Sequence, residues 1–196
     1  MNPLSTFKKA KSKIRRQRYP LKNIASNINP KIFMKLGIIS DIHDKVDILR
    51  KALDILQKTD ALICCGDLCS PFVIRELGTH YNKEIHLVLG NNDADIFRIT
   101  QNSQNFPQIK IYPEIGDIIL ANKRIGFIHY DNLARPIIAS GWYDIFCFGH
   151  NHQYEIGIEG KTRFINPGEL SGVLTGKSTC AILDTEDGLP EKPIIF

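Results

Sequence analysis

The sequence predicts an α/β fold with two packed sheets flanked by helices. Between residues 35 and 90, short apolar runs alternate with segments of helical periodicity. That alternation is typical of parallel strands joined by right-handed helical crossovers. From residue 117 onward, apolar runs separated by turn residues predict further strands, which we assign to a second sheet.

The first half of this region predicts three buried strands and two helices. The strands are short apolar runs, and the first helix has apolar residues at spacings of three and four. A proline suits the first turn of the second helix. The predicted strands cover residues 35–40, 61–65 and 84–90, and the predicted helices cover residues 45–58 and 71–81.

The second half predicts a series of strands without an internal repeat. The predicted strand segments cover residues 117–130, 143–149, 154–166 and 178–185. Two of these segments contain turn residues, at Asn122-Lys123 and at Glu159-Gly160, and are therefore predicted to be hairpins.

A basic N-terminal extension is set apart from the rest of the chain. The net charge is +4, but residues 1–35 hold ten Lys and Arg and no acid, and the other 161 residues hold 15 basic and 21 acidic residues, a formal charge of −6. We expect residues 1–34 to be mostly disordered, with a short helix over 5–18 as an option, and residues 35–196 to form one domain. The acidic domain does not favour nucleic acid as a partner.

Three interpretations of the extension stay open. It is a basic tail that contacts anionic partners, an organellar transit peptide, or a stretch that precedes the true start at Met34, which is the favoured interpretation. We expect a cytoplasmic protein, or an organellar one if residues 1–33 are a transit peptide. The chain has no apolar run long enough to span a bilayer, so no membrane partner is expected, and a homo-oligomer is left open.

The five cysteines lie in or beside apolar segments, and their number is odd. Buried free thiols in a reducing compartment are therefore favoured over a disulfide framework.

Seven side chains of metal-ligand type stand directly after predicted strands. Loops at the carboxyl ends of strands in an open α/β sheet meet in one crevice, so these side chains are expected to converge. They are Asp41, His43, Asp67, Asn91, His129, His150 and His152. His86 falls inside a strand and His80 near a helix end, and both are expected to be structural.

Two carboxylates, one amide and four imidazoles form a mixed nitrogen and oxygen set that suits Mn, Fe, Zn or similar divalent ions. The set needs no cysteine, which disfavours a structural zinc cage. Seven ligands are more than one tetrahedral site can take, and this number suits two ions that share a carboxylate. Two such ions can hold a hydroxide and clamp the oxygens of a phosphate during in-line attack.

These blocks resemble the calcineurin-like metallophosphoesterase superfamily, whose pattern is D-x-H, G-D, G-N-x-[D/E], a His after a strand, and G-H-x-H. Here the blocks read "DIH", "GD", "GNND", "IHY" and "GHNH". The resemblance runs from about Lys35 to the C-terminus. It is greatest to the small bacterial and archaeal phosphodiesterases of the YfcE type, whose N-P-G-S loop is similar to "FINPGEL" at 164–170. It implies a four-layer αββα sandwich of two mixed sheets flanked by helices.

The resemblance also implies a site and an activity. A hydroxide that bridges two metal ions would attack small phosphodiesters in line. One ion would be held by Asp41, His43, Asp67 and His152, and the other by Asp67, Asn91, His129 and His150, so that Asp67 bridges. The ions would be Mn²⁺ in the first instance, with Ni²⁺, Fe²⁺, Zn²⁺ and Mg²⁺ left open. Asp93 would orient a ligand or the backbone.

The chain departs from the family pattern at three places. Asn92 stands where many members have a histidine that protonates the leaving group, and an amide cannot act as a general acid. Asn92 and Asp93 are therefore the expected catalytic positions, with no clear general acid. Tyr130 and Asp131 replace the last two residues of a His-Gly-His and alter the pocket wall, with Asp131 as a weak donor candidate. Glu169 replaces the serine of N-P-G-S and would repel anionic substrates if it pointed inward.

Two other functions stay open. The same fold serves as a non-catalytic protein-interaction scaffold in a retromer subunit with an impaired metal site, whereas all seven ligand positions are competent here. A nuclease is disfavoured by the acidic domain, the absence of a separate capping domain and the few aromatic residues near the motifs.

Overall fold

The structure of the chain is a computed structural model, in which residues 33–186 and 193–196 are described. The predictions for residues 1–32, including the disordered extension and its short helix, lie outside the described residues. In the described ranges, none of the helices combines the length and the apolar character that a membrane crossing needs.

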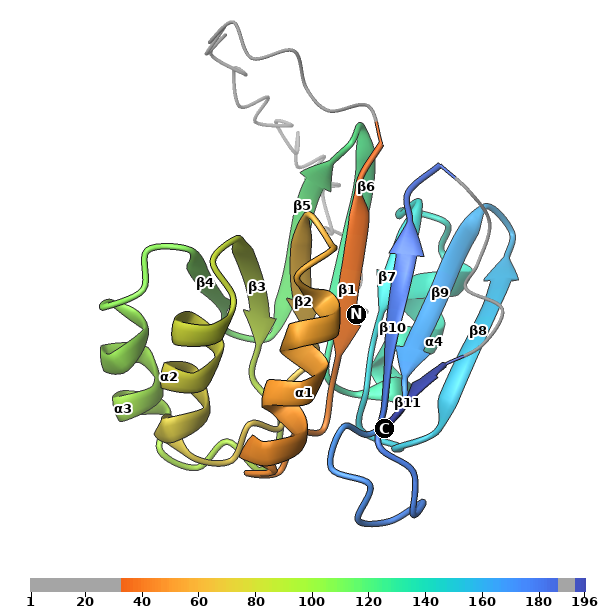
Figure 1. Cartoon of the computed structure of the whole chain (residues 1–196). Coiled ribbons are helices and arrows are strands. Elements are labelled where there is room, and N and C mark those ends of the chain that lie inside the picture. Colours follow the sequence, from red (N-terminus) through yellow and green to blue (C-terminus); the bar gives the residue numbers. More distant parts are fainter. Residues whose placement is uncertain (1–32, 187–192) are drawn as a thin grey trace, which may run out of the picture.

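Two mixed sheets pack against each other at the centre of the domain (Figure 1). The six-stranded sheet has the order β11-β10-β1-β2-β3-β4. Its four parallel strands are β1 (Lys35–Ile39), β2 (Ala61–Cys64), β3 (Glu84–Val88) and β4 (Ile109–Tyr112). At one edge, β10 (Thr179–Asp184) runs antiparallel to β1, and β11 (Ile194–Ile195) runs antiparallel to β10.

The five-stranded sheet has the order β5-β6-β7-β9-β8. Its strands are β5 (Ile115–Leu120), β6 (Lys123–Ile128), β7 (Ile145–Cys147), β8 (Tyr154–Glu159) and β9 (Thr162–Pro167). The two hairpins β5–β6 and β8–β9 form its edges, and β6, β7 and β9 run parallel in the middle.

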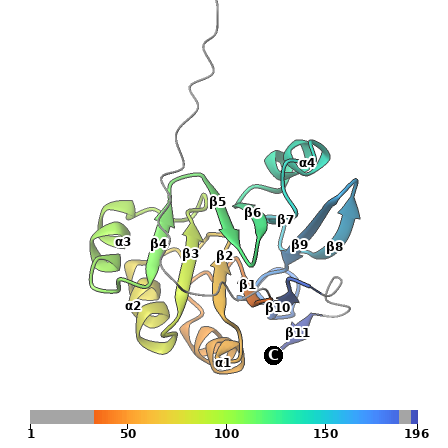
Figure 2. The same cartoon turned by 90° about the horizontal axis from the view of Figure 1, so that it is seen from above.

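Helices cover the outer faces of both sheets (Figure 2). The six-stranded sheet is covered by α1 (Val46–Leu56), α2 (Pro71–His80) and α3 (Ile96–Ser103), and the five-stranded sheet is covered by α4 (Asp131–Ala139). The layers run helix, sheet, sheet, helix, which confirms the predicted αββα sandwich.

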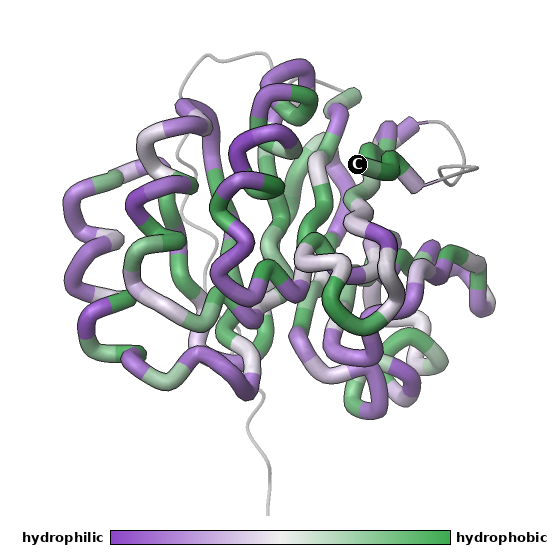
Figure 3. The backbone as a smooth tube through the Cα atoms, turned by 60° about the horizontal axis from the view of Figure 1, so that its bottom comes forward, coloured by the Kyte–Doolittle hydropathy of each residue, from purple (hydrophilic) through white to green (hydrophobic). Residues whose placement is uncertain are grey.

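The core follows these layers because successive side chains of a strand point to opposite faces. In β1, Ile39 packs under the helices with Leu49 and Leu53, whereas Ile38 packs between the sheets with Phe127. Strands that are buried on both faces consist of nearly continuous apolar runs, which explains why the central strands could be predicted from the sequence. Figure 3 shows this pattern as hydrophobic segments along the central strands and hydrophilic stretches on the outer helices.

The structure corrects the predicted elements at several points. The sequence-based prediction lacks α3, β4, α4 and β11. Both hairpin turns lie one residue away from their predicted places, because Lys123 already pairs with Leu120 and Thr162 with Glu159. The first turn is Ala121-Asn122, with φ of 48° and 58°, and the second is Gly160-Lys161.

Candidate metal centre

The seven predicted ligand residues lie in five loops at one end of the two sheets. Asp41 and His43 follow β1, Asp67 follows β2, Asn91 follows β3, His129 follows β6, and His150 and His152 follow β7. Neighbouring parallel strands end on the same side of their sheet, which gathers these loops. The structure brings all seven residues together, as the distances between their polar atoms show.

Asp41, His43 and His152 form a first cluster. Nε2 of His152 lies 3.3 Å from Oδ1 of Asp41, and Nε2 of His43 lies 3.9 Å from the same oxygen. Within the described part of the chain, Oδ1 of Asp41 and Nε2 of His43 are buried and have no hydrogen-bond partner. Buried polar atoms are normally paired, so these two atoms fit a cation as their missing partner.

His129 lies at the centre of a second cluster. Its Nε2 is 2.9 Å from Oδ1 of Asn91, 3.2 Å from Nδ1 of His150 and 3.5 Å from Oδ2 of Asp67. Its Nδ1 is 2.7 Å from the backbone carbonyl oxygen of Cys65, which can only accept, so Nδ1 carries the ring proton. Nε2 of His129 therefore faces an amide oxygen, a carboxylate oxygen and an imidazole nitrogen, which is a set of ligand atoms that suits a divalent cation.

Asp67 lies between the two clusters. Its Oδ2 is 3.5 Å from Nε2 of His43 and 3.5 Å from Nε2 of His129. Asn92 donates to the same carboxylate, from its backbone N–H to Oδ1 at 2.8 Å and from its side-chain amide to Oδ2 at 2.7 Å. The carboxylate of Asp67 therefore lies close to a histidine of each cluster, which is the position that a bridging ligand requires.

Asp93 ties two of the loops together from behind. Its carboxylate accepts hydrogen bonds from the backbone N–H groups of Gly90 at 2.7 Å, Cys69 at 2.8 Å and Asp67 at 3.1 Å. Burial raises the pKa of Asp93, and burial likewise raises the pKa of Asp41. Asp93 therefore holds the backbone around Asp67 by hydrogen bonds.

The backbone of the site is held in the left-handed region at five of the seven predicted ligands. Their φ angles are 54° at Asp41, 44° at His43, 56° at Asp67, 72° at His150 and 62° at His152. Residues other than glycine adopt this conformation at a cost of roughly 1–3 kcal/mol each, and such strain clusters at functional sites. Glycine is needed at position 90, where a Cβ would collide with Oδ1 of Asp67.

Glu169 is completely buried and lies against His152, with its Oε2 at 2.9 Å from Nδ1 of the ring. Ser171, Thr175 and the backbone of residues 173–175 also donate hydrogen bonds to it. Burial acts to raise the pKa of Glu169, but the hydrogen bonds from Ser171, Thr175 and His152 lower it to about 2. The carboxylate of Glu169 therefore forms its hydrogen bonds with this loop and with His152. It does not act as a free negative charge that would repel a substrate. Sequence reasoning missed this contact, although Glu169 follows strand β9 as the predicted ligand residues follow their own strands.

The other departures from the family pattern border the second cluster. The ring of Tyr130 lies 5.1 Å from the rings of both His129 and His150, so it forms a wall beside them. Asp131 begins α4 and accepts a long hydrogen bond of 3.4 Å from the side-chain amide of Asn151.

The two histidines expected to be structural lie outside both clusters. His80 is on α2, with Nε2 at 3.3 Å from Glu76, and His86 is on β3, with Nδ1 at 3.0 Å from the hydroxyl of Tyr112. All five cysteines are free, and Cys69 places its Sγ 3.3 Å from Nδ1 of His43.

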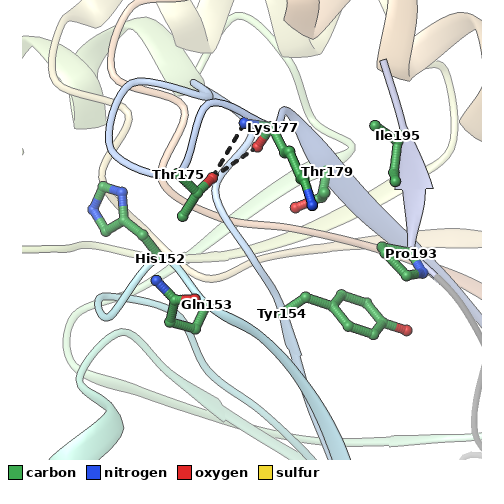
Figure 4. Close-up of a pocket in the computed structure, with 8 residues that line it drawn as sticks. All are labelled: His152, Gln153, Tyr154, Thr175, Lys177, Thr179, Pro193 and Ile195. Carbon is green, nitrogen blue, oxygen red and sulfur yellow. Dashed lines mark hydrogen bonds between the residues drawn. The ribbon is translucent and has the colours of Figure 1, made fainter.

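A cavity of about 320 Å³ opens beside His152 (Figure 4). Figure 4 shows His152 at one end of it and Pro193 and Ile195 at the other, with Thr175 and Lys177 along one side. Of the seven predicted ligands, His152 alone lines this cavity, so it is a space next to the site and not the site itself.

Comparison with known proteins agrees with the geometry. Residues 34–188 match the calcineurin-like phosphoesterase superfamily domain. The chain is 36% identical over 160 residues to phosphodiesterase MJ0936 of Methanocaldococcus jannaschii. The aligned region covers 78% of this chain and 94% of that protein.

Solved structures have the same fold. An archaeal phosphodiesterase superposes with a TM-score of 0.77 at 32% identity, over 83% of this chain and 100% of the other. The phosphoesterase YfcE of E. coli superposes with a TM-score of 0.58 over 76% of this chain and 88% of the other, and at 21% identity it shows the fold alone. The resemblance predicted from the motifs is thereby confirmed, and the chain belongs to the calcineurin-like phosphoesterase superfamily.

Proposed function

We propose that the chain is a metal-dependent phosphodiesterase that hydrolyses small phosphodiesters. The observation that carries this proposal is the pair of buried polar atoms that lie 3.9 Å apart without a hydrogen-bond partner, Oδ1 of Asp41 and Nε2 of His43. Phosphodiesterase MJ0936, at 36% identity, supports a diester as the substrate class.

In this proposal two divalent ions share the site. Asp41, His43, Asp67 and His152 hold one ion, and Asp67, Asn91, His129 and His150 hold the other. Mn²⁺ is the first expectation, and the mixed set of imidazoles and oxygens also suits other divalent ions such as Fe²⁺ and Zn²⁺. When bound, the ions stabilise charge on the phosphoryl oxygens and lower the pKa of water toward about 7.

The protein contributes orientation to this chemistry. The carbonyl of Cys65 fixes the tautomer of His129, and the carboxylate of Glu169 fixes that of His152. Asp93 holds the backbone around Asp67. Partners of this kind keep ligand atoms aimed at one point before a cation arrives, which raises affinity.

The test compares bis-p-nitrophenyl phosphate, a diester, with p-nitrophenyl phosphate, a monoester. We expect turnover of the diester in added Mn²⁺, little turnover of the monoester, and none in chelator. Asp67→Ala should abolish the activity because both clusters lose their shared carboxylate. His80→Ala, which changes an exposed histidine outside both clusters, should retain it.

Two results would contradict the proposal. Diester hydrolysis that survives in chelator or in Asp67→Ala would exclude the proposed centre. Absence of turnover by wild-type protein that carries metal would favour the non-catalytic scaffold instead.

A further inference from the structure

The tautomer of His152 is set by a carboxylate. An ionised carboxylate can only accept, so the contact of 2.9 Å between Oε2 of Glu169 and Nδ1 of His152 places the ring proton on Nδ1. Nε2 then carries the lone pair, and it lies 3.3 Å from Oδ1 of Asp41. In the other tautomer Nε2 would carry a proton and could not bind a cation.

Glu169 is held in place by the loop that follows it. Its carboxylate accepts hydrogen bonds from the hydroxyls of Ser171 at 2.6 Å and Thr175 at 2.7 Å. The backbone N–H groups of Val173, Leu174 and Thr175 donate at 3.0, 2.9 and 2.5 Å. With His152 these donors occupy the acceptor sites of both carboxylate oxygens, so Glu169 is not available as an eighth ligand.

A serine at this position, as in the related N-P-G-S loop, could not do the same. A serine side chain is shorter and neutral, and one hydroxyl cannot accept from this number of donors. A carboxylate partner also increases the basicity of a ligating imidazole, and the protein partner of the corresponding ring nitrogen of His129 is a neutral carbonyl. His129 and His152 therefore have ring partners of different charge.

We propose that Glu169 is a positioning residue that strengthens cation binding at the cluster of Asp41, His43 and His152. It acts by holding Nδ1–H of His152, and the segment 171–175 in turn holds Glu169. This inference rests on the metal centre of the proposed function.

The test is a titration of metal-free, full-length protein with Mn²⁺, with free Mn²⁺ measured by electron paramagnetic resonance. In Glu169→Gln we expect the affinity for one ion to fall by about ten- to a hundredfold, the usual effect of losing such a partner, while the other ion is unaffected. Glu76→Gln is the matched control. It makes the same exchange of carboxylate for amide at a residue that contacts His80 outside both clusters, so both affinities should stay close to wild type.

The outcomes separate this inference from the proposed function. Wild-type affinities in Glu169→Gln would overturn the inference alone, and so would equal losses in Glu169→Gln and Glu76→Gln. Wild-type protein that binds no Mn²⁺ would overturn both. Should Glu169→Gln fail to fold, long-range ¹H–¹⁵N spectra of the metal-free wild type decide the matter. A proton on Nδ1 of His152 supports the inference, and a proton on Nε2 of the neutral ring overturns it.

Discussion

Asn92 donates hydrogen bonds to both oxygens of Asp67 but has no proton to give to a leaving group. We therefore expect wild-type protein to favour diesters with good leaving groups. Asn92→His should accelerate the hydrolysis of alkyl diesters by about 10²-fold or more, since general acid catalysis contributes about 10²–10⁴-fold to a rate. The rate of hydrolysis of aryl diesters should change much less, because their leaving groups need less protonation. The measurement is kcat for an alkyl diester and a p-nitrophenyl diester.

Asn92→Ala is the control for this residue, because it removes the amide without adding an acid. The gain in Asn92→His should decline as pH rises above about 6.5, where the imidazolium loses its proton. A gain of equal size for both leaving groups, or a gain shared by Asn92→Ala, would contradict a role as proton donor.

At the scale of elements, Asp93 joins the loop after β2 to the loop after β3. Asp93→Ala would leave three backbone N–H groups without their acceptor, at about 1–3 kcal/mol for each that stays buried. Relief of the buried charge offsets part of this cost, since burial raises the pKa of Asp93. We expect a net loss of a few kcal/mol in the free energy of unfolding, measured by urea denaturation.

Asp95→Ala is the comparison, because Asp95 lies two residues away and accepts from the N–H of Arg98 at the start of α3. Loss of such a cap costs about 1 kcal/mol. If Asp93→Ala cost no more than Asp95→Ala, the link between the two loops would not contribute to stability.

The elements that could be predicted are those with a strong pattern. Strands β1 to β3 are buried on both faces and mostly apolar, and α1 buries four residues at helical spacing. By contrast, α3 buries Ile99 alone, α4 contains Pro136, and β11 has two residues. These elements depend on packing and on neighbouring strands, which leave little periodicity in the sequence.

The site was more predictable than the fold around it. Each of the seven predicted ligand residues lies in a loop that follows a strand, so a rule on strand ends was enough to predict that they lie close together. The contact of Glu169 with His152 could not be predicted in the same way. It depends on the path of residues 171–175, a loop without periodicity whose apolar residues Val173 and Leu174 are 60% and 72% exposed.

At the scale of the whole molecule, the candidate metal centre spans the two sheets. Asp41, Asp67 and Asn91 follow strands of the six-stranded sheet, whereas His129 and the pair at 150 and 152 follow strands of the five-stranded sheet. Ions held by both sets of ligands would link the sheets at one end, in addition to the apolar core between them. Metal binding should therefore stabilise the whole domain and not a local loop.

This argument predicts that Mn²⁺ raises the melting temperature of the wild type relative to chelator. One site filled at a hundred times its Kd adds about 2.7 kcal/mol to the free energy of unfolding. The effect should shrink between about pH 7.5 and about pH 5, because protons compete with the ions for imidazoles whose ordinary pKa is about 6.5. Thermal melts with and without Mn²⁺ at both pH values measure whether the shift in melting temperature is smaller at the lower pH.

Asp67→Ala should sharply reduce the shift in melting temperature that Mn²⁺ causes, since Asp67 contacts histidines from both sheets. A shift of equal size in that variant would mean that Mn²⁺ stabilises the domain at another place and that the sheets are held together by their apolar core alone.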